Sequence, residues 1–173
     1  MWKFYPSRMA APEWVPRVIA VFAHAASKID SKSNHGVSSD AVLAALRPAL
    51  VELGFAIESS KKKADKIWRP VLFGEAGESV VAYEVDGFHQ ELGIILEIEA
   101  GRGAMNNADY RDLVRSSLIV DAEFLILGQM LEYRAGKKDA VTPSYKRTRD
   151  QLDAIYASER LKLPFKGVLL VGY

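Results

Sequence analysis

The sequence predicts a single-domain α/β protein in which a mixed β-sheet is flanked by helices. Three observations predict this class. Apolar residues recur at helical spacing near both ends of the chain, and they alternate with polar residues in its middle. The third observation is the uninterrupted apolar run Gly167–Gly172, which is typical of a strand covered on both faces. Because the 173 residues contain no repeat or linker, one domain is expected over residues 1–173.

The first third of the chain predicts two helices. Over residues 12–29 the apolar positions recur at helical spacing. Ser38 or Ser39 can cap a second helix, which turns its leucines inward and can end at Gly54. Pro48 lies inside this second helix and is expected to kink it or split it.

The centre of the chain has the shorter period of β-strands. Four strands are predicted, at residues 55–58, Ile67–Phe73, 79–88 and 93–100. A hairpin-like connection through Gln90 and Glu91 joins the last two of them. These two strands are therefore expected to be neighbours in the sheet.

The last third predicts a helix, a strand, a second helix and a final strand. Asn106 or Asn107 can cap the first of these helices, and Ser144 can open the second. A buried strand is predicted at 124–130, before the closing run Gly167–Gly172. The complete order is α-α-β-β-β-β-α-β-α-β, a mixed sheet flanked by helices.

Composition excludes several classes of function. The chain has no cysteine, so it forms no disulfide, thiolate nucleophile or cysteine-ligated zinc site. No apolar run approaches the roughly 18 residues that span a bilayer, and the N-terminus does not resemble a signal peptide, so we expect a cytoplasmic protein with no membrane partner. The formal net charge is +1, so any contact with nucleic acid must use a local basic patch.

Two neighbouring predicted strands each have one apolar face and one face that ends in carboxylates. Side chains alternate along a strand, so Glu84 and Asp86 share a face. By the same rule Glu97 and Glu99 share a face of the next strand. The hairpin connection would place Asp86 opposite Ile95, with Glu97 a diagonal neighbour about 7–8 Å away at the backbone. Because neighbouring like charges repel, a hard divalent cation such as Mg²⁺ would stabilise this face; a solvated edge hairpin is the alternative.

This pattern resembles the PD-(D/E)XK nuclease superfamily. The resemblance rests on Tyr83-Glu84-Val85-Asp86-Gly87 and on Ile94-Ile95-Leu96-Glu97-Ile98-Glu99, followed by a helix and a strand. Most members have an acid–x–Lys triplet, whereas this chain has Glu99 at the lysine position and Val85 where proline is frequent. The acid–x–acid triplet is similar to that of BamHI-like and BglII-like type II restriction endonucleases. The resemblance covers roughly residues 42–130 and implies a restriction-endonuclease-like sheet with an αβββαβ core.

The resemblance implies a metal-dependent endonuclease that hydrolyses phosphodiester bonds in DNA. Asp86 and Glu97 would hold Mg²⁺, with Mn²⁺ as a substitute, and Glu99 would ligate a second metal or accept a proton from the attacking water. Cutting both strands would favour a homodimer. Related nucleases often supply a further acid from the preceding helix, and Glu52 is the candidate here. For Glu52 the ordinary interpretation, an exposed glutamate at a helix end, is favoured.

Basic residues near the predicted site are candidates for phosphate contacts. Arg102 follows the acid–x–acid strand in a glycine-containing loop, and Arg111 and Arg115 are one helical turn apart. The densest candidate patch is Lys61, Lys62 and Lys63. Each has an ordinary alternative as a solvated surface residue.

Two other functions remain open at this stage. A nuclease-like module could bind DNA or a protein partner through its basic loops without turnover, and the glutamate at the lysine position motivates this hypothesis. An interaction or scaffold protein with a solvated acidic face is the third possibility. In that case, neutralising Glu97 would affect no ligand.

Overall fold

The computed structural model describes residues 1–100, 108–134 and 141–173. Its main sheet has six strands and is mixed, because β10, β7 and β6 run parallel to one another and the remaining pairs are antiparallel. In spatial order the strands are β1 (Trp2–Tyr5), β10 (Gly167–Gly172), β7 (Phe124–Gln129), β6 (Ile94–Glu99), β5 (Gly87–His89) and β2 (Phe55–Ile57). This arrangement confirms the predicted α/β class.

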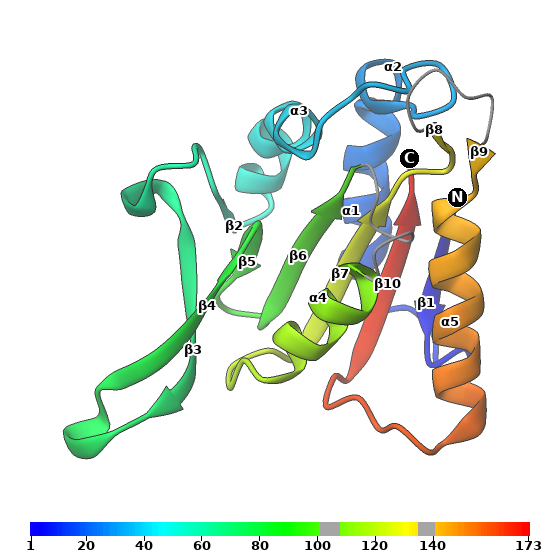
Figure 1. The fold of residues 1–173 in the computed structure, drawn as a ribbon. Coiled ribbons are helices and arrows are strands. Elements are labelled where there is room, and N and C mark those ends of the chain that lie inside the picture. Colours follow the sequence, from blue (N-terminus) through cyan, green and yellow to red (C-terminus); the bar gives the residue numbers. More distant parts are fainter. Residues whose placement is uncertain (101–107, 135–140) are drawn as a thin grey trace.

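Helices cover both faces of the sheet (Figure 1). The α-helices of the described residues are α1 (Trp14–His24), α2 (Ala26–Ile29), α3 (Ser39–Glu52), α4 (Ala108–Ser117) and α5 (Ser144–Ser158). Helices α1, α2 and α3 share one hydrophobic cluster with Leu96 of β6, and α4 and α5 share the other with Ile95. Because side chains alternate along β6, Glu97 lies on the same face as Ile95, beneath α4.

Helix α3 begins as predicted but is not split. The Ser38 hydroxyl accepts a hydrogen bond from the Ala41 N–H at 3.2 Å, which is the expected N-cap. The helix then runs without interruption through Pro48, so of the two outcomes predicted, a kink or a split, the split does not occur. Leu46 and Leu50, on either side of the proline, are completely buried, and their packing holds both halves of the helix on the sheet.

The single strand predicted at 79–88 is divided at Asp86. Its first part, β4 (Ser79–Val85), pairs with β3 (Ile67–Phe73) in a separate two-stranded ribbon. This ribbon, here called the arm (residues 67–85), projects from the β2 side of the main sheet (Figure 1). The second part, β5, enters the sheet at Gly87, where a Cβ atom would lie only 2.5 Å from Ile57 Cδ1. Glycine therefore permits the close approach of β5 to β2.

The register of β5 and β6 also differs from the prediction. Phe88 pairs with Ile95 and Gly87 with Leu96, so Asp86 continues toward Glu97 rather than Ile95. The difference is two residues. Since strand side chains repeat with a period of two, the predicted faces are preserved and the two acids come closer than expected.

Short elements complete the described chain. Strand β1 was not predicted, because a four-residue edge strand that pairs with the distant β10 has no local signal. The pair β8 (Tyr133–Arg134) and β9 (Val141–Thr142) and the 3₁₀ turns Lys63–Asp65 and Glu75–Gly77 are also short. None of the helices in the described ranges is both long enough and apolar enough to cross a membrane.

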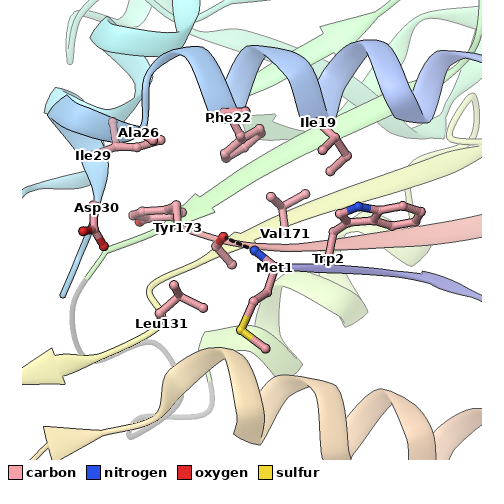
Figure 2. Close-up of a pocket in the computed structure, with 12 residues that line it drawn as sticks. Met1, Trp2, Ile19, Phe22, Ala26, Ile29, Asp30, Leu131, Val171 and Tyr173 are labelled. Carbon is pink, nitrogen blue, oxygen red and sulfur yellow. Dashed lines mark hydrogen bonds between the residues drawn. The ribbon is translucent and has the colours of Figure 1, made fainter.

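The edge formed by β1 and β10 borders an apolar pocket of about 230 Å³ beneath α1 (Figure 2). Here the Met1 amino group donates a hydrogen bond to the Gly172 carbonyl at 3.2 Å. Phe22 and Tyr173 also line this pocket, and both belong to the α1–α3 cluster. The pocket is therefore on the face of the sheet opposite to Glu97.

Candidate functional site

Asp86 lies where the arm joins the main sheet. Its carboxylate accepts a hydrogen bond from the Ile98 backbone N–H at 2.7 Å, and its carbonyl accepts one from the Glu58 N–H at 3.0 Å. Burial raises the pKa of Asp86 to about 7. The Ile98 N–H opposes this shift, while the charge of Glu58 adds to it. Main-chain hydrogen bonds from β6 and from the residue that follows β2 thus hold Asp86 at this junction.

Glu97 is the next acid of the cluster. Burial raises its pKa well above the usual range, and the charge of Asp86 raises it further. Arg115 is the neighbouring charge that acts in the opposite direction. The structure shows no hydrogen bond or ion pair from the Glu97 carboxylate to another described residue, so little compensates for its partial burial.

Glu99 shares its surroundings with Asp112 of α4, which is only 4% exposed. Burial, a hydrogen bond with Asp112 and the charge of that residue together raise the pKa of Glu99 to about 8, and burial contributes most. Arg111 lies between the two acids, 3.1 Å from Asp112 and 3.2 Å from Glu99. Helix α4 therefore adds a fourth carboxylate and a partial counter-charge to the site. We call Asp86, Glu97, Glu99 and Asp112 the acid cluster.

Lys66 provides positive charge on the other side of Asp86. Its Nζ atom lies 2.7 Å from a Glu58 oxygen and 3.2 Å from a Glu84 oxygen, and its side chain is 13% exposed. The hydrogen bond with Glu58 is the main cause of its raised pKa. The charge of Lys66 in turn lowers the pKa of Asp86. This pairing joins the base of the arm to the end of β2.

The acid cluster fits a hard divalent cation in its donor chemistry but not in its present spacing. Carboxylate oxygens are the ligands that Mg²⁺ prefers, and the mutual increase in pKa shows that the cluster lacks positive charge. However, within residues 1–100, 108–134 and 141–173, no group of three or more Asp, Glu or His side chains is spaced to hold a metal ion. Binding a cation would therefore require side-chain rotations that bring the carboxylates together.

Glu52 and the lysine run lie apart from the acid cluster. Glu52 is the exposed last residue of α3 and makes no hydrogen bond or ion pair with the cluster. Lys61, Lys62 and Lys63 are exposed near the start of the arm, and Lys61 pairs with Asp40 at 3.0 Å. Their location leaves all three lysines accessible to a ligand.

The predicted arginines have different positions. Arg111 and Arg115 both face the acid cluster or the arm. Arg115 donates to the Glu84 carbonyl at 3.4 Å and lies over the Tyr83 ring, 5.2 Å from its centroid. Arg102 lies outside the described residues. Arg111 therefore pairs with acids of the protein itself, whereas Arg115 packs against the arm and makes no ion pair with a described residue.

Sequence reasoning missed Glu58, Lys66 and Asp112. A signal for Asp112 was present, because Asp109, Asp112 and Ser116 follow helical spacing and all three are buried. Polar residues on the inner face of a helix that follows an acidic strand indicate a polar site beneath that helix. Glu58 and Lys66 had no comparable signal, since their contact depends on how the arm folds back.

No family model, curated protein or solved structure matches this chain. The structure itself defines the class: a mixed α/β protein in which helices flank a mixed sheet. Its distinguishing feature is the acid cluster at the junction between the arm and the sheet.

Proposed function

We propose that this chain is a Mg²⁺-dependent DNA endonuclease of the restriction-endonuclease-like type, which hydrolyses phosphodiester bonds and accepts Mn²⁺ in place of Mg²⁺. The observation that carries the proposal is the convergence of Asp86, Glu97 and Glu99 from two neighbouring strands, with pKa values raised by burial and by one another. Groups of perturbed carboxylates are typical of active sites.

The order of elements around the acid cluster supports this proposal. Without the arm, the chain runs α3-β2-β5-β6-α4-β7, which is the αβββαβ order expected for this type of nuclease. Strands β2, β5, β6 and β7 are consecutive neighbours in the sheet. Asp86 directly precedes β5, and the acid–x–acid triplet ends β6, as the resemblance requires.

The roles of the residues follow from their surroundings. Asp86 and Glu97 would hold the first cation, and Glu99 would contact a second cation or accept the proton of the attacking water. When bound, Mg²⁺ would polarise the scissile phosphate and lower the pKa of water. Arg111 orients Glu99, and Lys66 favours the ionised form of Asp86. In this proposal the chain cuts both strands of DNA as a homodimer.

A second candidate function is a binding module that contacts DNA without cutting it. Two observations favour it. Glu99 occupies the lysine position of the motif, and Arg111 already neutralises Glu99 and Asp112 without a metal ion. In this case the exposed lysines near the arm would bind phosphates, and the acid cluster would have no catalytic role.

Cleavage of plasmid and phage DNA in Mg²⁺ or Mn²⁺ tests the proposal. The native protein is compared with Glu97→Gln, which removes one charge at nearly constant volume, and with Glu52→Gln as a control outside the acid cluster. The endonuclease proposal expects metal-dependent fragments from the native and Glu52→Gln proteins and none from Glu97→Gln. Retardation of DNA on gels, without cleavage by any of the three, would instead support the binding module.

A further inference from the structure

The tip of the arm, residues 72–80, carries an unexplained apolar surface. Leu72, Phe73 and Val80 are 55%, 49% and 60% exposed. Large apolar side chains grouped at the end of a projecting ribbon are typical of contact surfaces, because their exposure to water is unfavourable. Among the described residues, the arm tip pairs with no strand of the main sheet.

The arm tip is also acidic. Residues 70–83 contain no lysine or arginine, whereas Glu75 and Glu78 are both exposed at the turn between β3 and β4. A partner for this tip therefore needs an apolar surface with a basic rim, rather than the phosphate backbone of DNA, which would be repelled.

A surface of that kind lies on the same molecule, at the end of α5. Two adjoining cavities of about 440 and 340 Å³ share Pro6, Arg8 and Tyr156, and together they form what we call the basal groove. Met9 and Leu161, at 52% and 53% exposure, give the groove apolar walls.

The rim of the basal groove is basic. Arg8, Lys162 and Lys166 line it, opposed by Glu159 and by Asp153, and Asp153 is already paired with Lys3 at 2.5 Å. Arg8 and Lys162 are exposed and form no ion pair with a described residue, whereas Lys166 pairs with Glu123 at 2.9 Å. The groove thus offers the charge that the arm tip lacks.

The arm cannot fill the groove of its own molecule. The groove adjoins β1 at one edge of the main sheet, and the arm leaves beside β2 at the other edge. With six strands about 4.8 Å apart, these edges are separated by about 25 Å. Figure 1 shows the arm projecting away from β1 and α5. Another molecule must therefore supply the tip.

We infer that the arm tip of one molecule docks in the basal groove of a second copy, and that the second copy's tip docks reciprocally in the first. Leu72 and Phe73 contact the apolar walls, while Glu75 and Glu78 face the basic rim. Reciprocal docking closes into a two-fold dimer instead of an open chain of molecules. This inference deepens the homodimer of the proposed function by naming its contact surfaces, and its test does not depend on whether the protein cuts DNA.

Charge reversal on each surface tests the inference by light scattering coupled to gel filtration. The native protein should have the mass of a dimer at micromolar concentration. Glu75→Lys with Glu78→Lys, or Arg8→Glu with Lys162→Glu, should each weaken the dimer at least about tenfold because like charges then meet. Glu52→Lys with Glu91→Lys reverses two exposed acids elsewhere and should leave the dimer intact.

Mixing the two reversed proteins provides the decisive measurement. Each tip then meets a groove of opposite charge in the other protein, so the mixture should form a mixed dimer, detectable by native mass spectrometry. A native protein that stays monomeric would overturn the inference, as would a dimer that survives both reversals. Failure to form the mixed dimer would do so too, provided that circular dichroism shows both variants folded.

Discussion

The Asp86 carboxylate accepts a hydrogen bond from the backbone N–H of Ile98, 2.7 Å away, at the junction between the arm and the sheet. Ile98 lies between Glu97 and Glu99, so this bond holds the first acid beside the other two. The Ile98 N–H compensates only the Asp86 carboxylate, and Arg111 compensates only Glu99 and Asp112, so the repulsion at Glu97 stays largely uncompensated. Several measurable properties of the protein follow from that imbalance.

Removing one charge from the acid cluster should stabilise the metal-free protein. At a pH high enough to ionise Glu97, Glu97→Gln is expected to increase the free energy of unfolding by about 1 kcal/mol, because it removes a partly buried charge that Asp86 repels. Urea unfolding with EDTA present measures this change. Mg²⁺ should then raise the melting temperature of the native protein and not that of the variant. A lower free energy of unfolding for Glu97→Gln would contradict the inference that repulsion between the carboxylates destabilises the metal-free protein.

The stability of the metal-free protein should fall as the pH rises. Folded-state pKa values of about 7 for Asp86 and about 8 for Glu99 lie above the roughly 4 expected in the unfolded chain. The stability associated with their protons is therefore complete below about pH 4 and is lost as the pH rises through 7 and 8. Unfolding at about pH 5 and about pH 9 measures the difference. Glu99→Gln should reduce this difference in the free energy of unfolding. An unchanged difference would show that the protonation of Glu99 does not contribute to it.

Asp112 should control the protonation of Glu99. Asp112→Asn removes the charge that raises the pKa of Glu99, so this pKa is expected to decrease. Nuclear magnetic resonance titration of the Glu99 side chain measures the shift directly. Asp109→Asn is the matched control on the same helix. Asp109 accepts a hydrogen bond from the Thr148 hydroxyl at 3.0 Å, so its loss should cost about 1 kcal/mol of stability. The pKa of Glu99 should stay the same in that control.

Removing only one member of the buried ion pair Glu58–Lys66, at the base of the arm, should destabilise the protein. Lys66→Met leaves Glu58, which is 7% exposed, without its cation and should destabilise the protein by about 3 kcal/mol. Glu58→Gln combined with Lys66→Met should recover much of this loss, since no buried charge remains unpaired at that position. Denaturant unfolding of both single variants and the double variant gives the coupling energy. Simple additivity of the two single effects would show that the pair contributes little.

Gly87 should tolerate a side chain poorly. Its Cβ atom would lie 2.5 Å from Ile57 Cδ1, which must shift, and 3.2 Å from the Ala56 carbonyl oxygen of the β2 backbone, so Gly87→Ala is expected to destabilise the protein by about 1–3 kcal/mol. Gly36→Ala is the control, because a methyl group at that position would have no other atom within 4 Å. Thermal unfolding of the two variants compares them. Equal stability would mean that β5 can move away from β2 at little cost.

The sequence predicted the elements whose signals are local. The N-cap at Ser38 and the buried run of β10 are examples, since each depends on residues a few positions apart. The break at Asp86 was not predictable in this way. Asp86-Gly87 is a turn signal at the break, but nothing within residues 79–88 indicates that the two halves join different sheets. The choice of β3 as the partner of β4 is a tertiary effect.

The candidate site was predictable in part for the same reason. The shared face of Glu97 and Glu99 follows from strand alternation, which a two-residue change in register does not alter. Asp112 approaches the other acids from α4, and Lys66 approaches Asp86 from the residue before the arm, so both approaches are set by packing between distant segments. The apolar residues of α4 alone do not indicate that the buried face of this helix also carries Asp109, Asp112 and Ser116.

The arm begins next to Lys66 and ends next to Asp86, so one attachment adjoins a member of the acid cluster and the other carries the charge that lowers the pKa of that member. A force applied to the tip of the arm would be transmitted along β3 and β4 to this junction. Turning the ribbon would rotate the Asp86 carboxylate against its anchor at Ile98 and pull Lys66 away from Glu58. A partner bound at the tip of the arm could therefore change the position of the Asp86 carboxylate without contacting it.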